Sequence, residues 1–85
     1  MYVDIYREKN GLYSVICKND KYQDYIGTGR KTKLSAIGYA ICEIEYMIHE
    51  FGISDDSNGI SMFTENELYD IKFKLEEIEE DEIKE

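Results

Sequence analysis

The residues with the most reactive side chains are few and lie far apart in the sequence. His49 is the only histidine, and Cys17 and Cys42 are the only cysteines. Catalysis needs a nucleophile beside a base or paired carboxylates in a pocket, and a metal site needs a cluster of ligands. No GxSxG, HExxH or CxxC pattern supplies these arrangements. We therefore predict a protein that is not an enzyme, with no catalytic residue, no metal site and no cofactor, and interpret His49 as structural.

A basic cluster follows a glycine-containing segment in the first half of the chain. Gly27-Thr28-Gly29 precedes Arg30, Lys31 and Lys33, at the start of a predicted helix. Backbone N–H groups and the helix dipole can hold an anion at such a position. The Rossmann and P-loop patterns both fail here, because their later glycine and lysine positions do not match. We keep these three basic residues as an alternative, anion-binding site.

Residues 54–65 share part of the pattern of an EF-hand calcium loop. Asp56, Asn58, Gly59 and Glu65 fall at its third, fifth, sixth and twelfth places. Ser54 replaces the first carboxylate, which removes charge that a hard cation needs. We therefore expect a polar turn here and no calcium site.

Aromatic and acidic side chains lie outside the apolar stripes of the predicted helices. Helical spacing places four of them on one outer face of the first helix and two on the second: Tyr39, Glu43, Tyr46 and Glu50, then Tyr69 and Phe73. Aromatic rings stack on guanidinium groups and carboxylates pair with them. We predict that these six residues bind a partner protein. The alternative is that the rings cover the sheet edge or a contact between two copies.

The net charge of the chain indicates which kinds of partner it can bind. The net charge is −9, and residues 34–85 carry fifteen acidic against three basic residues. Such a chain is repelled by nucleic acid and by anionic membranes and is attracted to basic surfaces. We expect a basic protein partner, with no direct binding to nucleic acid or membrane. No secretory signal precedes the first strand and the cysteines are few, so we expect a cytoplasmic protein.

In size, acidity and composition the chain resembles the small phage-encoded inhibitors of bacterial defence, the anti-CRISPR and anti-restriction proteins. No motif carries this resemblance. It implies a non-catalytic inhibitor in the host cytoplasm, which docks acidic and aromatic groups on the basic groove of a nucleic-acid-processing defence enzyme. Two alternatives remain open: a regulatory domain that binds an anion at the basic cluster, and an accessory subunit of an obligate oligomer, including a homodimer.

Three β-strands are predicted to come first along the chain. Residues 2–8 and 21–26 alternate with a period of two, and residues 12–18 are rich in β-forming residues. Asn10-Gly11 predicts a type I′ hairpin turn, and Asn19-Asp20 predicts a second turn. The glycines at 27 and 29 are expected to end the third strand. The pattern predicts an antiparallel meander.

Two helices are predicted to follow the meander. The first has an apolar stripe at spacings of 3 and 4: Leu34, Ile37, Ile41, Ile44, Ile48 and Phe51. Thr32 is its expected N-cap, and Gly52 is expected to lie just past its end. The stripe is expected to pack on the sheet.

Thr64-Glu65-Asn66-Glu67 has the form of a capping box, followed by Leu68, Ile71, Leu75 and Ile78 at helical spacing. Strict alternation of Tyr69, Ile71, Phe73 and Leu75 leaves a strand as the alternative. The predicted fold is α+β with the order β-β-β-α-α. Residues 1–78 form one domain, and residues 79–85 form an acidic tail expected to fray.

Overall fold

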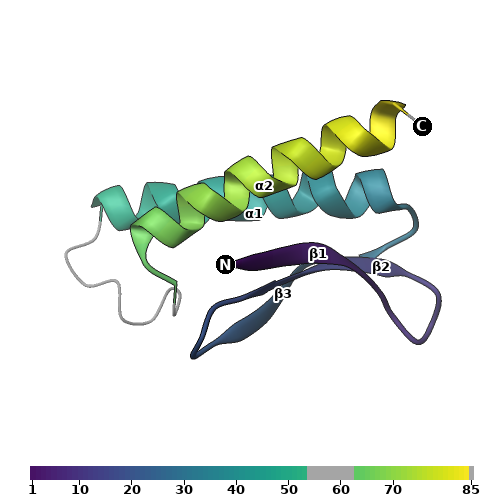
Figure 1. Ribbon diagram of the computed structural model, residues 1–85, viewed down its shortest axis with the longest axis horizontal. Coiled ribbons are helices and arrows are strands. Elements are labelled where there is room, and N and C mark those ends of the chain that lie inside the picture. Colours follow the sequence, from purple (N-terminus) through teal and green to yellow (C-terminus); the bar gives the residue numbers. More distant parts are fainter. Residues whose placement is uncertain (54–62, 85) are drawn as a thin grey trace.

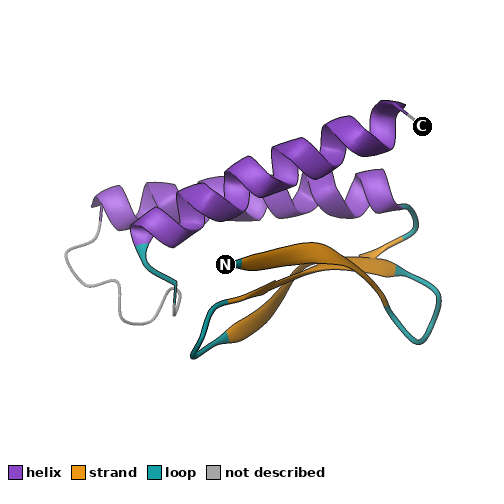
Figure 2. Cartoon of the chain, in the orientation of Figure 1, coloured by secondary structure: helices purple, strands orange, loops and turns teal. Residues whose placement is uncertain are grey.

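The computed structural model describes residues 1–53 and 63–84. Its elements are β1 (Tyr2–Arg7), β2 (Tyr13–Lys18), β3 (Gln23–Arg30), α1 (Lys33–Ile53) and α2 (Glu65–Lys84). The strands form one antiparallel sheet in the order β1-β2-β3. The predicted β-β-β-α-α fold is therefore confirmed, and the last element is a helix and not a strand. Figures 1 and 2 show α1 and α2 side by side and antiparallel, as one layer over one face of the sheet.

The core lies between the sheet and the helix layer. Alternate residues of the strands, one side of each helix and the residue two before α2 contribute to it: Val15, Cys17, Ile26, Ala36, Ile37, Ala40, Ile44, Leu68, Ile71 and Leu75, with Phe63. The other face of the sheet is not covered by a helix (Figure 2). It carries the intervening residues of each strand, among them three exposed tyrosines.

The first hairpin closes with a different turn from the one predicted. Gly11 has a φ of 86°, whereas Asn10 does not have the positive φ that a type I′ turn requires. The Gly11 N–H donates to the Glu8 carbonyl, and the Glu8 N–H donates to the Leu12 carbonyl. This is a type I turn followed by a glycine bulge. The second turn lies where it was predicted, with the Asn19 side chain accepting hydrogen bonds from the Lys21 and Tyr22 N–H groups.

β3 does not end at its glycines but continues to Arg30. The β2–β3 register shifts between Tyr13 and Val15, opposite this part of β3. Gly27 has a φ of 57°, and a Cβ built on it lies 2.3 Å from the Ala36 carbonyl oxygen. The glycine is therefore needed for the close approach of β3 to α1.

α1 begins as predicted, because the Thr32 hydroxyl accepts a hydrogen bond from the Ser35 N–H at 3.1 Å. Its end differs, since the helix runs through Gly52 to Ile53. Its buried stripe also differs: Leu34 is 43% exposed, whereas Ala36 and Ala40 are fully buried. The small side chains of these alanines allow the sheet to approach one side of α1. The stripe of buried residues on α1 therefore lies closer to β3 than the predicted stripe.

α2 begins with the predicted capping box. The Glu67 carboxylate accepts from the Thr64 N–H at 2.9 Å, and the Thr64 hydroxyl accepts from the Glu67 N–H at 3.2 Å. The helix continues to Lys84, through residues assigned to a separate tail. The calcium-loop segment lies mostly outside the described residues. Neither helix, over the ranges the structure describes, is long and apolar enough to cross a membrane.

Candidate functional site

A groove of about 550 Å³ runs along the outer side of α1. It is lined by Tyr39, Cys42, Glu43, Tyr46 and Met47. Residues three and four apart on a helix lie on one face, which is why this single element forms the groove. Three of the six predicted partner-binding residues therefore lie together. Cys42 and Met47 were not predicted, although they have the same helical spacing, because the prediction considered only aromatic and acidic residues.

The groove presents rings and a carboxylate to solvent. Tyr39 and Tyr46 are 50% and 64% exposed, although each is large enough to be buried in a core. Glu43, which lies between the two tyrosines in the sequence, is half-buried. Met47, which also lines the groove, packs against the core. The groove floor is thus tied to the core, while its aromatic walls remain available for contact.

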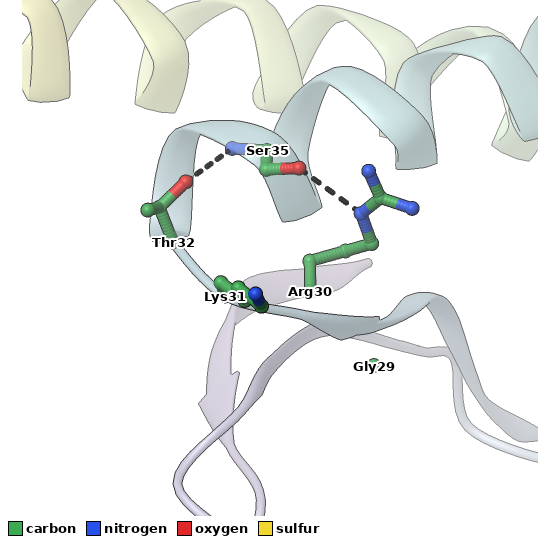
Figure 3. Close-up of a pocket in the computed structure, with 5 residues that line it drawn as sticks. All are labelled: Gly29, Arg30, Lys31, Thr32 and Ser35. Carbon is green, nitrogen blue, oxygen red and sulfur yellow. Dashed lines mark hydrogen bonds between the residues drawn. The ribbon is translucent and has the colours of Figure 1, made fainter.

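One of the rings that line this groove, Tyr39, already contacts a guanidinium group, that of Arg30. Its central carbon lies 4.5 Å from the centre of the Tyr39 ring, within the range of a cation–π contact. Its Nε donates to the Ser35 hydroxyl at 3.0 Å, as Figure 3 shows. The exposed ring of Tyr39 therefore stacks on an arginine inside the molecule, using the chemistry predicted for a partner.

Glu50 extends the acidic side of the groove by one helical turn. The Tyr46 hydroxyl donates a hydrogen bond to the Glu50 carboxylate, and this bond, with the negative charge of Glu50, raises the pKa of Tyr46 above its ordinary value of 10.0. Glu50 does not line the groove itself. It acts on the groove through Tyr46.

Tyr69 and Phe73 form a separate exposed pair on α2. They are 46% and 66% exposed, and neither lines the α1 groove. An ion pair of 3.4 Å between the Lys72 ammonium group and the Glu45 carboxylate joins the outer sides of α1 and α2. The six predicted residues therefore form two patches on the helix layer, one on each helix.

The basic residues of the alternative site are only partly brought together. A pocket of about 410 Å³ at the start of α1 is lined by Gly29, Arg30, Lys31, Thr32 and Ser35 (Figure 3). Lys33 does not line it, and its ammonium group lies 4.0 Å from the Glu82 carboxylate. Arg30 and the capping Thr32 have the internal partners already described. The local sequence gave no sign of the Lys33–Glu82 contact, because Glu82 lies in the segment assigned to the tail.

His49 and Cys17 line neither of the two pockets described above. His49 is exposed on α1. Over the described residues, no group of three or more histidine, cysteine or acidic side chains is placed to hold a metal ion. The buried Cys17 has a pKa raised to about 12, mainly because burial disfavours the thiolate and also because Asp24 and Glu43 are negative.

Comparison with known proteins adds no assignment. No protein-family model matches the chain, and searches of curated proteins and of solved structures find no significant match.

Proposed function

We propose that the protein is a non-catalytic binding module that docks the α1 groove onto a basic surface of another protein. The observation that carries this proposal is the groove itself, in which two half-exposed tyrosines flank a carboxylate on a rigid helix. Exposed aromatic residues beside a charge are typical of the anchors of protein interfaces.

Arginine side chains of the partner suit this groove better than lysines. A guanidinium group is planar, so it stacks on a tyrosine face and also forms paired hydrogen bonds with a carboxylate. The contact between Arg30 and Tyr39 provides the internal example. Each such cation–π contact contributes about 0.5–2 kcal/mol, more when the interface excludes water.

The charge of the molecule supports the same partner class. A net charge of −9 attracts a basic surface over long range and speeds encounter. Because this attraction is screened by salt, binding is expected to weaken as ionic strength rises. The same charge disfavours nucleic acid itself as the ligand.

The more specific form of the proposal is an inhibitor of a nucleic-acid-processing defence enzyme, of the anti-CRISPR or anti-restriction kind. In this form, Glu43 and Glu50 take the place of phosphates on the partner's basic groove. The acidic second part of the chain supports it, because fifteen of the nineteen acidic residues lie in residues 34–85. The protein then acts in the cytoplasm of the host cell.

The two alternatives have less support. An anion at the basic cluster must compete with Ser35 and Tyr39 for Arg30 and with Glu82 for Lys33. Pairing of two copies through the sheet edges is opposed by their aspartates, because Asp4 and Asp24 accept the Ile5 and Tyr25 N–H groups at 2.8 and 2.9 Å. An oligomer formed through Tyr69 and Phe73 remains as the competitor.

Affinity capture from host lysate at low and high salt tests the proposal. Three baits are compared: the wild type, Glu43→Lys with Glu50→Lys, and Asp20→Lys with Asp81→Lys. Both double variants change the charge equally, but only the first alters the groove region. We expect a basic protein that the wild type and the second variant retain at low salt and the groove variant loses. Retention by the groove variant, or capture that does not respond to salt, contradicts the proposal.

A further inference from the structure

The open face of the sheet contains a third, smaller pocket that the sequence patterns did not indicate. It has a volume of about 290 Å³ and is lined by Tyr6, Glu8, Ser14, Tyr25 and Thr28. These residues come from all three strands and from the turn after β1. Tyr6, Ser14 and Tyr25 alternate with core-facing residues of the same strands, so the pocket lies on the sheet face opposite the core and is separate from the groove discussed above.

Ser14 forms a polar floor with an unmet hydrogen-bonding capacity. The residue is 1% exposed, and its hydroxyl oxygen has no hydrogen-bond partner among the described residues. Burying a hydroxyl group without a partner is unfavourable, and few such groups occur in native structures. A ligand that donates a hydrogen bond to this oxygen supplies the hydrogen bond that the Ser14 hydroxyl lacks in the folded protein.

Two tyrosine rings form the walls above Ser14. Tyr6 lies directly across from Ser14 in the β1–β2 register, and Tyr25 lies on the other side of β2. Their ring centres are 5.1 Å apart with an angle of 55° between the planes. The Tyr25 hydroxyl is held by a hydrogen bond from the Gln23 amide at 3.0 Å. Both rings remain about two-fifths exposed, so their faces are accessible.

Glu8 brings a fixed negative charge to the same pocket. One oxygen of its carboxylate accepts a hydrogen bond from the Gly29 N–H at 2.9 Å. This bond joins the end of β1 to β3 and leaves the other oxygen of the carboxylate available. Thr28, also in β3, contributes a hydroxyl group to the lining.

We propose that this pocket binds a guanidinium group. The lining offers hydrogen-bond acceptors, aromatic faces and one negative charge, a combination that favours a planar cation and disfavours an anion. Its volume of about 290 Å³ lies just below the usual range for ligand pockets, which suits one such small group. Elsewhere in the chain Arg7 and Arg30 lie over Tyr13 and Tyr39, so arginine–tyrosine contacts are already part of this structure. The guanidinium comes either from an arginine side chain of a protein or from a free arginine-like compound.

NMR titration of the isolated protein with methylguanidinium chloride tests this site, with sodium chloride as the ionic-strength control. We expect saturable shifts centred on Tyr6, Ser14 and Tyr25. Glu8→Gln keeps an acceptor for the Gly29 N–H but loses the charge, and should weaken binding roughly tenfold. Ser14→Ala should weaken binding without lowering stability, because it removes an unpartnered hydroxyl. Glu76→Gln, an exposed change on α2, should leave binding unchanged.

The α1 groove is tested in parallel so that the two sites are not confused. Glu43→Gln should leave methylguanidinium binding at the Ser14 pocket intact. Shifts that do not saturate, that centre on Tyr39 and Tyr46, or that persist unchanged in Glu8→Gln overturn this proposal and leave the proposed function standing. Comparison of free arginine with N-acetyl-arginine amide separates the sources: a preference for the blocked form indicates a protein side chain, and the reverse indicates a free compound.

Discussion

The contact between Gly27 and α1 makes a sharp prediction for the substitution Gly27→Ala. A Cβ at this position lies 2.3 Å from the Ala36 carbonyl oxygen and 3.0 Å from the Ala40 nitrogen, both of them backbone atoms of α1. Because carbon–oxygen contacts lie at about 3.3 Å or more, the helix must move away from β3 by roughly 1 Å. Such overpacking costs about 1–3 kcal/mol. The positive φ of an alanine adds about 1–2 kcal/mol.

Gly29→Ala is the matched control. Gly29 also has a positive φ, 71°, but a Cβ there meets no atom within 4 Å. We therefore expect a loss of roughly 2–5 kcal/mol in the free energy of unfolding for Gly27→Ala. Gly29→Ala should lose only about 1–2 kcal/mol.

Urea unfolding followed by circular dichroism measures both losses. Because a small domain is stable by only about 5–15 kcal/mol, Gly27→Ala is expected to be close to unfolded, or to have a much lower midpoint. If the two variants lose the same free energy, α1 does not approach β3 as described, and the position of the groove relative to the sheet is wrong.

Further predictions concern the cap of α2 and the two cysteines. Thr64→Ala should destabilise the protein by about 1 kcal/mol, because it removes the capping hydroxyl. Hydrogen bonds from the Thr64 N–H and the Asn19 amide hold the pKa of Glu67 below its ordinary value of 4.5. The ionised Glu67 carboxylate therefore stabilises the folded protein fully above pH 4.5, and this stabilisation is lost as the pH falls through the lower pKa that Glu67 has in the folded state. Acid unfolding of Glu67→Gln should lack this component. A thiol reagent at neutral pH should modify Cys42 in the folded protein and Cys17 only after unfolding, as mass spectrometry would show. The pKa of Cys17 is raised from 9.0 to about 12 in the folded state, so the thiol ionises first in the unfolded chain as the pH rises. The free energy of unfolding should therefore fall progressively between pH 9 and about 12.

The elements that depend on local patterns were predictable from the sequence. Alternation predicted the first and third strands, β-rich composition predicted the second, and spacings of 3 and 4 predicted the helices. The caps at Thr32 and Thr64 depend on residues within three positions of each other, so a short sequence window contains both partners. The helical period also placed Tyr39, Glu43 and Tyr46 on one face, where the structure has them.

Features that depend on tertiary approach were not predictable in the same way. The helical period predicts that α1 has a buried stripe, but the sheet and α2 together determine which residues lie at its centre. Leu34 was therefore wrongly included in the stripe, and Ala36 was missed. From the local sequence, Gly27 is expected to end a strand. Its role in the close contact with α1 depends on a helix that follows later in the chain. The pocket around Ser14 joins residues up to twenty-two positions apart, and the register of its strands depends on the β2–β3 bulge.

A binding titration of the captured partner tests the central claim most directly. The titration compares the wild type, Glu43→Lys with Glu50→Lys, Asp20→Lys with Asp81→Lys, and a chain lacking residues 81–85, with circular dichroism of each. Loss of carboxylates that pair with arginine in an interface costs about 2–5 kcal/mol, so we predict a roughly 30-fold to several-thousand-fold loss of affinity for the groove variant. The charge-matched variant and the truncated chain should bind almost normally. Normal binding by a folded groove variant, with loss of binding on truncation alone, would contradict the claim and identify the acidic end of α2 as the binding element.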